Sequence, residues 1–176
     1  MSNNLMSVFT GKDELAIRFT TGLHPRVSMQ IPNNKGADTL VEGWAALHMY
    51  PFLLGFRLPF PELVMSFLQT YKLPPSQLHP QVWQILYIFS NLSKAYNVKV
   101  DVGVLMSTYN ISVGDTGVIS LGKKEGVHPF VWEVNTEVDE LWASKFFFVN
   151  VESASRFYGD DLKYLGVPWC TDGKIL

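Results

Sequence analysis

The hydrophobic pattern divides the chain into a first part with helical spacing and a later part with strand spacing. Between residues 39 and 109, apolar side chains recur every three or four positions, which is typical of helices with one buried face. After Asn110, glycines interrupt the chain and short apolar stretches replace this spacing. We therefore expect an α+β protein with about four helices in its N-terminal half, followed by a small antiparallel sheet of about three strands.

The stretch LPPSQLHPQVWQILYIFSNLS, residues 73–93, carries no formal charge. It does not predict a membrane span, because only the part after Pro80 can be a continuous helix, and a bilayer requires roughly 20 apolar residues. The spacing predicts a helix over residues 80–96 with His79 just outside it, since a residue before proline avoids helical dihedral angles. Ser76 is the alternative cap. We expect a central helix whose buried face is formed by Val82, Ile85, Leu86, Phe89, Leu92 and Tyr96.

Three other segments are also predicted to be helical. Residues 39–50 have apolar residues at helical spacing, and Thr39 and Glu42 have the spacing of a capping box. Residues 61–72 begin with proline and carry one apolar face. Asp101 is a suitable cap for a shorter helix that follows it.

The remaining apolar stretches predict strands. Residues 118–121 and 129–134 are expected to be joined by a loop over 123–127, and the segment 145–151 is apolar on both faces, which is typical of a buried strand. A short helical turn is expected around residues 138–143. The complete set of expected strands is 15–19, 26–32, 118–121, 129–134 and 145–151, of which the first two could equally be extended arms.

Length and composition favour a single globular unit. The chain has 176 residues, of which 47% are hydrophobic and 17% are charged. The charged fraction lies below the usual value of about 25%, which indicates buried helices or an adhesive surface. We expect an N-terminal arm at residues 1–36, one domain at 37–151, and a C-terminal tail at 152–176 that packs on the domain or trails from it.

The charge balance argues against a dedicated nucleic-acid-binding protein. The net charge is -2, whereas such proteins usually carry a basic excess that neutralises phosphates. The tightest basic cluster is Lys123 and Lys124, which Glu125 follows at once. We therefore expect weak and non-specific binding at most. The candidate contacts for it are Arg57, Lys94, Lys99, Lys123, Lys124 and Lys145.

No catalytic, cofactor-binding or metal-binding residues are predicted. The stretch GVISLGKK, residues 117–124, resembles a phosphate-binding loop but lacks its final hydroxyl residue and lies between predicted strands. Adjacent carboxylates such as Asp160 and Asp161 point apart on a helix or a strand. The histidines lack the spacing of a metal site. The chain has four of them, at His24, His48, His79 and His128, and all except His48 directly precede a proline.

Cysteine content and the N-terminus predict the compartment. Cys170 is the only cysteine, so no internal disulfide can form, and the first residues lack the pattern of a secretory signal. We expect an intracellular protein, nuclear or cytoplasmic, that has no membrane contact.

Several motifs resemble the gypsy-type transposon (transposase-like) domain family of plant genomes. They are GFRLP at residues 55–59, PSQLHPQVW at 75–83, Trp142, and FFFV at 146–149, in the family's order over about residues 43–151. The resemblance implies a retroelement-derived domain to which no activity is securely attached. Ala143 stands where the family commonly has lysine, which weakens the expectation of a basic surface.

We therefore expect a non-enzymatic retroelement-derived module that acts in protein interaction or assembly, with a protein partner or with itself. The first alternative is a nucleic-acid-binding accessory protein of a transposon. The second is a metal-dependent transposase or nuclease, which would need converging acidic residues on a central sheet.

Overall fold

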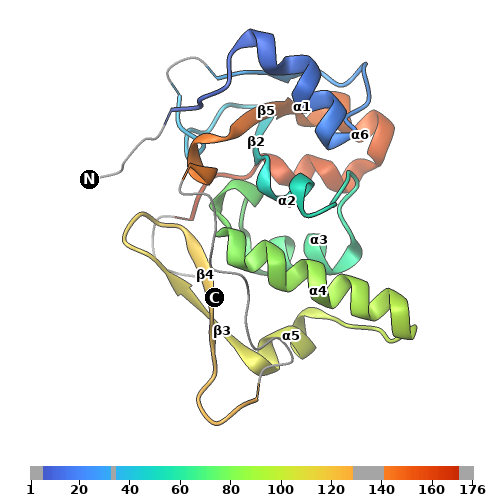
Figure 1. The fold of residues 1–176 in the computed structure, drawn as a ribbon, viewed down its shortest axis with the longest axis vertical. Coiled ribbons are helices and arrows are strands. Elements are labelled where there is room, and N and C mark those ends of the chain that lie inside the picture. Colours follow the sequence, from blue (N-terminus) through green and yellow to red (C-terminus); the bar gives the residue numbers. More distant parts are fainter. Residues whose placement is uncertain (1–5, 33–34, 129–140, 171–176) are drawn as a thin grey trace.

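The computed structural model describes residues 6–32, 35–128 and 141–170, and Figure 1 shows the order of its elements. The α-helices are α1 (Glu14–Thr21), α2 (Tyr50–Leu53), α3 (Glu62–Tyr71), α4 (Pro80–Tyr96), α5 (Val102–Thr108) and α6 (Val151–Tyr158). Short 3₁₀ helices are η1 (Gly11–Asp13), η2 (Pro75–Gln77), η3 (Trp142–Ser144) and η4 (Asp160–Gly166). The strands are β1 (Met29–Gln30), β2 (Trp44–His48), β3 (Tyr109–Val113), β4 (Ile119–Lys123) and β5 (Phe146–Asn150).

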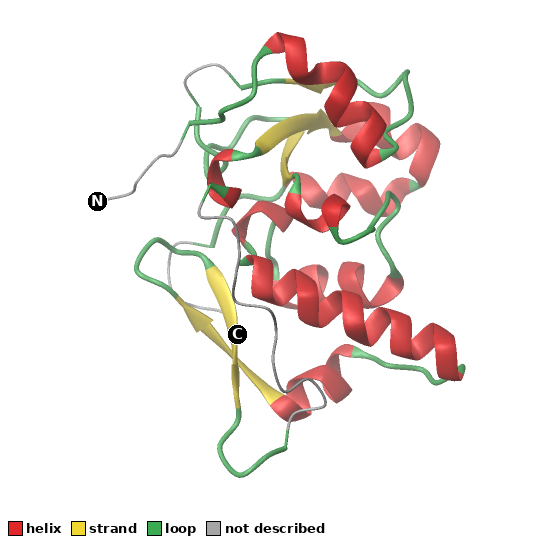
Figure 2. Ribbon diagram, in the orientation of Figure 1, coloured by secondary structure: helices red, strands yellow, loops and turns green. Residues whose placement is uncertain are grey.

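The mixture of helices and antiparallel sheets was predicted, but their distribution along the chain was not. Figure 2 shows helices before, between and after the strands. The described residues form two sheets, one with the order β1-β5-β2 and one with β3 beside β4. Two strands of the first sheet come from the N-terminal half, and α6 and η4 follow the last strand, so the expected order of a helical half and then a sheet is wrong.

Strand β5 is the centre of the three-stranded sheet. It pairs antiparallel with β1 on one side and β2 on the other, so that Phe148 lies opposite both Gln30 and Ala46. Its residues from Phe146 to Val149 are all buried, which confirms the expectation of a strand covered on both faces. Strand β1 also confirms a short part of the extended segment expected at 26–32.

The β3–β4 ribbon rests on the start of α4. Strand β4 contains most of the segment expected at 118–121, and it pairs with β3, which the sequence did not predict. The His79 backbone N–H donates to the Ile119 carbonyl oxygen at 2.8 Å, and Leu78 forms an isolated bridge to Ile119. The strand expected at 129–134 lies outside the described residues.

Helices with clear local signals form where the sequence predicted them. Helix α4 spans the predicted residues, and the His79 side chain caps it by accepting a hydrogen bond from the Gln81 N–H at 3.2 Å. Asp101 caps α5 by accepting from the Val104 N–H at 2.9 Å. The buried face of α4 is shorter than expected, because Tyr96 is 74% exposed and Leu92 also reaches the surface.

The helix expected over 39–50 is wrong. This segment holds β2, which follows Gly43, a residue whose φ of 75° breaks any continuous helix. Ala45 through His48 are buried on both faces of the strand, so the alternation that normally marks a strand is missing. The capping-box spacing of Thr39 and Glu42 therefore does not begin a helix.

The strand expected over 15–19 is also wrong, because this segment is helix α1. Ile17 and Thr21 lie four residues apart and are both buried, as one helical face requires. Gly22 ends the helix in the left-handed conformation at φ 66°. The apparent alternation arises because Leu15 and Phe19 are apolar although they face outward.

One hydrophobic cluster connects most elements. Trp83 on α4 packs its ring against Phe56 and Phe60, with centroids 5.6 and 5.3 Å apart. Phe147 of β5 and Ile17 of α1 belong to the same cluster, so the sheet, α1 and α4 share a core. Within the described ranges, no helix combines the length and apolar character needed to cross a bilayer.

Candidate functional site

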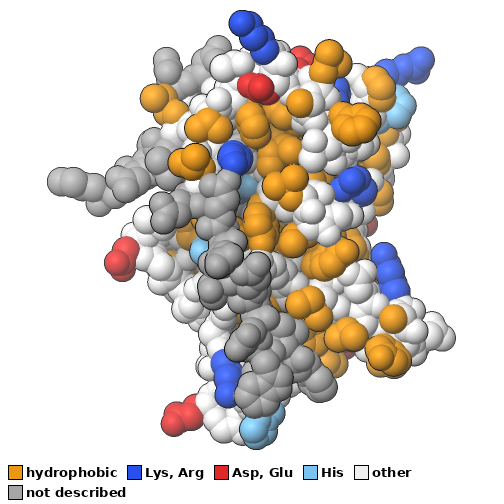
Figure 3. Space-filling model, in the orientation of Figure 1, with side chains coloured by type: hydrophobic (Ala, Val, Ile, Leu, Met, Phe, Trp, Pro, Cys, Tyr) orange, Lys and Arg blue, Asp and Glu red, His pale blue; other side chains and the backbone are white. Residues whose placement is uncertain are grey.

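The six basic residues proposed as nucleic-acid contacts lie on four parts of the fold. Lys94 and Lys99 line one pocket between α3 and α4. Arg57 follows α2, Lys145 directly precedes β5, and Lys123 with Lys124 stands at the end of β4. On the face shown in Figure 3, the Lys and Arg side chains stand apart from one another. The structure therefore brings two of the six candidates to one pocket.

The pocket between α3 and α4, called the α3–α4 pocket below, has a volume of about 160 Å³. Its walls come from the first turns of α3, the C-terminal half of α4 and the segment that leads into α5. The lining residues are Pro61, Glu62, Leu63, Ser66, Ser90, Ser93, Lys94, Lys99, Val100 and Asp101. Its walls combine apolar side chains with polar groups that carry both signs of charge.

A second polar group, formed by His48, Ser76 and Gln77 and called the η2 cluster below, lies inside the fold. The Gln77 side chain is fully buried; its Nε2 donates to the carbonyl oxygens of Gly117 and Cys170, and its Oε1 accepts from the Cys170 N–H, each at 2.9 Å. The Ser76 hydroxyl donates to the Ala37 carbonyl oxygen at 3.2 Å and accepts from the Trp169 indole N–H at 2.8 Å.

The η2 cluster therefore ties together segments that are far apart in the sequence. The two side chains reach residues 37, 117 and 169–170 from one short 3₁₀ turn. Hydrogen bonds of this kind satisfy buried polar groups and fix the position of the connected segments. The sequence indicates Ser76 only as an alternative helix cap. Its role in connecting distant segments could not be predicted, because its partners Ala37 and Trp169 are far from it in the chain.

His48 is the most strongly perturbed titratable residue among those described. Its Nε2 lies 3.2 Å from the Ser76 carbonyl oxygen, and its ring packs at 4.9 Å against the edge of Trp142. Burial lowers the pKa of His48 from 6.5 to about 4, although the neighbouring backbone groups of Ser76 oppose this shift. The imidazole is therefore neutral at physiological pH and serves as a buried hydrogen-bonding group.

Acidification should destabilise the protein through His48. The folded state holds this residue neutral, whereas the unfolded state binds a proton near pH 6.5, so stability is complete above that pH and is lost as the pH falls toward 4. Between pH 7 and pH 5 the expected loss from His48 is about 2 kcal/mol. Urea denaturation of wild type and His48→Gln at both pH values measures it, because the variant should lose less than wild type by that amount. Equal losses in the two proteins would contradict the assignment.

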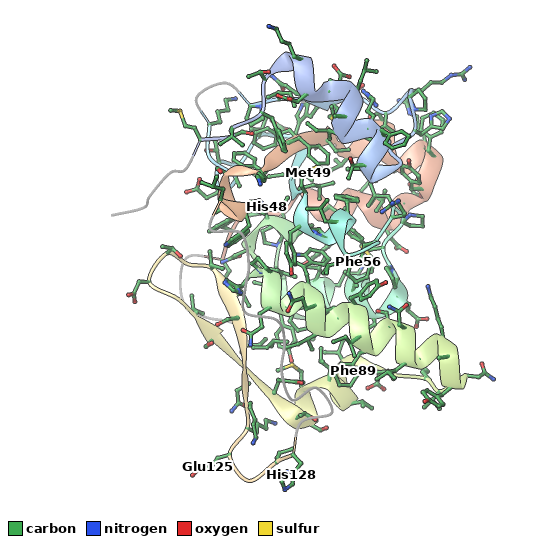
Figure 4. All side chains as sticks on the ribbon, viewed as in Figure 1. His48, Met49, Phe56, Phe89, Glu125 and His128 are labelled. Atoms are coloured by element: carbon green, nitrogen blue, oxygen red, sulfur yellow. The ribbon has the colours of Figure 1, made fainter. Side chains whose placement is uncertain are left out.

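The other histidines do not join His48 in a site. His79 contacts the same ring as His48, that of Trp142, with centroids 5.6 Å apart, and burial also lowers the pKa of His79. His24 stacks on Phe157 at 4.0 Å. Figure 4 places His48 inside the fold and His128 at the far end of the loop after β4. Among the described residues, no three His, Cys, Asp or Glu side chains lie close enough together to hold a metal ion.

Helix α1 carries an apolar outer face. Its exposed positions are Leu15, Ala16 and Phe19, with Leu15 81% and Phe19 91% exposed. The Glu14 carboxylate accepts a hydrogen bond from the Arg18 guanidinium at 2.9 Å along one edge of this face. Figure 3 shows hydrophobic side chains gathered over α1 and the adjoining α2. A surface helix normally shows the reverse arrangement, with its polar side outward.

The part of the chain from the end of β2 to β3 is similar to a known family. Residues 47–112 match the model of the family described as “Putative gypsy type transposon”. The resemblance predicted from the sequence is thereby confirmed over this range. No curated protein and no solved structure matches the chain. The transposon-related segment contains the whole of η2 and α4. Its motif PSQLHP supplies Ser76 and Gln77 to the η2 cluster, and His79 of the same motif caps α4.

Proposed function

We propose that this transposon-related chain is a non-enzymatic assembly module that associates with a second copy of itself through the outer face of α1. The observation that supports this proposal is the exposure of Leu15 and Phe19 on successive turns of one helix, with the charged Arg18 at the edge of the face they form. The polar residues of the family motif support a structural role, because Ser76 and Gln77 use their side chains to hold backbone groups inside the fold.

A second copy fits this face because the face is complementary to itself. Leu15 and Phe19 form a ridge with the small Ala16 beside it, so that two such helices can pack closely. In an antiparallel pair centred on Ile17, Arg18 of one copy would lie about 3 Å along the helix axis from Glu14 of the other. A parallel pair would place Glu14 beside Glu14, so the charges at the edge favour the antiparallel arrangement.

The expected dimer is weak. Burying one Leu or Phe side chain contributes about 1.5–3 kcal/mol, and association itself costs several kcal/mol in lost freedom of motion. We therefore expect a dissociation constant of about 10⁻⁵ to 10⁻⁴ M. Leu53 on α2 is 65% exposed beside α1 and would extend the contact.

Sedimentation velocity over a range of concentrations tests the proposal. Wild type should pass from monomer to dimer as its concentration rises. Phe19→Ser and Leu15→Ser should each weaken the dimer about tenfold or more, because each removes one of the two apolar side chains that form the ridge. The matched control is Tyr96→Ser, which removes a 74% exposed aromatic ring from the end of α4 and should leave the dimer unchanged. Glu14→Lys should also weaken association, by placing like charges at the edge.

Two results would refute self-association through α1. One is a wild-type chain that stays monomeric up to about 1 mM, well above the expected dissociation constant. The other is a dimer that Tyr96→Ser dissociates while Phe19→Ser leaves it intact. Thermal melts of each variant show that the fold is retained, as expected for exposed positions.

A further inference from the structure

We propose that the α3–α4 pocket binds a small oxyanion of the phosphate class, held by the N-terminus of α3, the Ser90 hydroxyl and the Lys94 ammonium group. This proposal is independent of self-association, because α1 contributes nothing to the pocket. A separate structural observation supports each of the three groups: the N-terminus of α3, the Ser90 hydroxyl and the Lys94 ammonium group.

The N-terminus of α3 is open toward a ligand. Its N-cap residue is Pro61, which has no side-chain acceptor, and no side chain caps the helix. The first bond of the helix joins the Met65 N–H to the Pro61 carbonyl oxygen, so the N–H groups of Glu62, Leu63 and Val64 have no partner within the helix. Pro61, Glu62 and Leu63 line the pocket, and the positive end of a 10-residue helix favours an anion there.

Ser90 provides an unsatisfied donor on the opposite wall. The residue is 6% exposed, and its buried hydroxyl has no hydrogen-bond partner in the part of the chain that the structure describes. A buried hydroxyl without a partner costs free energy, and native proteins rarely leave one unpaired. Because Ser90 lines the pocket, its hydroxyl can donate a hydrogen bond to a ligand oxygen bound there.

The charges around the pocket leave one cation available. Lys99 lies 4.0 Å from the Glu62 carboxylate, which is itself 85% exposed and directed to solvent. One oxygen of Asp101 is occupied by the Val104 N–H. Lys94 is exposed and has no hydrogen-bond or ion-pair partner among the described residues. A cation, an open helix N-terminus and a free hydroxyl are all donors, so the complementary ligand is an acceptor with negative charge.

The size of the pocket allows more than a bare ion. A volume of about 160 Å³ corresponds to roughly 11–16 water positions, since one water occupies about 10–15 Å³ in this measure. A phosphate group with a small substituent fits this space. The phosphate could be a free small compound or a phosphate of a nucleic acid, and the test separates these sources.

The experiment is a ¹H–¹⁵N NMR titration of the full chain with inorganic phosphate, in which chloride keeps the ionic strength constant. The amide signals of Glu62, Leu63 and Val64 should shift and saturate. Lys94→Gln and Ser90→Ala should each weaken binding about tenfold, the scale of a hydrogen bond to a charged group. Lys12→Gln is the matched control, because it removes an exposed lysine from η1 and should not change the affinity.

Ser90→Ala also separates a binding role from a structural one. The substitution removes an unpaired hydroxyl, so the variant should melt no lower than wild type in chloride and should gain less stability than wild type from added phosphate. The absence of a saturable response to phosphate overturns the proposal, and so does a response that both Lys94→Gln and Ser90→Ala leave unchanged.

A short oligonucleotide, with and without a 5′-phosphate, identifies the source of the anion. Tighter binding of the phosphorylated form that depends on Lys94 assigns the pocket to a terminal phosphate. Equal binding of both forms that depends on Lys94 assigns it to backbone phosphates. A response to inorganic phosphate alone assigns it to small phosphate compounds.

Discussion

Trp83→Ala is expected to lower the free energy of unfolding by about 3–5 kcal/mol, the usual cost of truncating a buried aromatic side chain. Trp83 is 1% exposed, and its indole packs against the rings of Phe56 and Phe60 in the centre of the shared core. Truncation would leave a cavity between α4 and the segment after α2 that neighbouring side chains cannot fill. Urea denaturation at pH 7 measures the change.

Three variants of the same helix region act as controls. Tyr96→Ala changes a ring that is 74% exposed and should cost less than about 0.5 kcal/mol. His79→Ala removes the cap of α4 and should cost about 1 kcal/mol. Trp83→Phe should cost less than Trp83→Ala, because it keeps an aromatic ring and removes a buried indole N–H that has no partner among the described residues.

The ranking of these variants decides between a core and a ligand site at the start of α4. If His79→Ala were the most damaging substitution, the cap would not explain its role. If zinc also raised the melting temperature of wild type and not that of His79→Ala, His79 would be a metal ligand, and the account of this segment as helix entry and core would be wrong.

Elements with signals in adjacent residues could be predicted from the sequence. Helix α4 begins at the predicted residue because His79 and Pro80 restrict the backbone locally and because the cap and the first N–H groups are neighbours in the chain. Asp101 fixes the start of α5 in the same way. Such signals do not depend on the rest of the fold.

Elements defined by distant partners could not be predicted in this way. Strand β2 is buried on both faces and pairs with β5, about a hundred residues later, so its local spacing fits a helix equally well. Helix α1 was predicted wrongly for the opposite reason. Its outward side chains are apolar, so Leu15, Ile17 and Phe19 resemble the alternation of a strand.

The candidate pocket was predicted only in part. Lys94 and Lys99 were singled out as basic residues, and both line the pocket although Asn97, which ends α4, lies between them in the sequence. Ser90 was missed, because an unsatisfied hydroxyl is visible only once burial is known. The η2 cluster was missed because its partners lie at residues 37, 117 and 169–170. In the sequence, the η2 cluster was marked only by the family motif PSQLHP. Ser76 and Gln77 of this motif are polar but buried in the structure.

Gln77→Ala should lower the free energy of unfolding by about 3 kcal/mol, because it removes three hydrogen bonds and leaves backbone groups of Gly117 and Cys170 without their partner. Gln77→Glu should cost at least as much, since a carboxylate would face two carbonyl oxygens in a buried position. The matched control is Gln69→Ala on the exposed side of α3, with an expected change below about 0.5 kcal/mol.

Limited proteolysis shows whether Gln77 holds the chain around Cys170 as well as stabilising the fold. In wild type, the Gln77 side chain accepts from the Cys170 N–H and donates to the Cys170 carbonyl oxygen, so cleavage near Cys170 requires that contact to open. Gln77→Ala should therefore be cut faster at this segment than at α3, where Gln69→Ala should behave as wild type does. A Gln77→Ala protein with wild-type stability and an unchanged cleavage pattern would mean that the η2 cluster does not fix the C-terminal segment. The buried polar residues of the motif would then need another explanation.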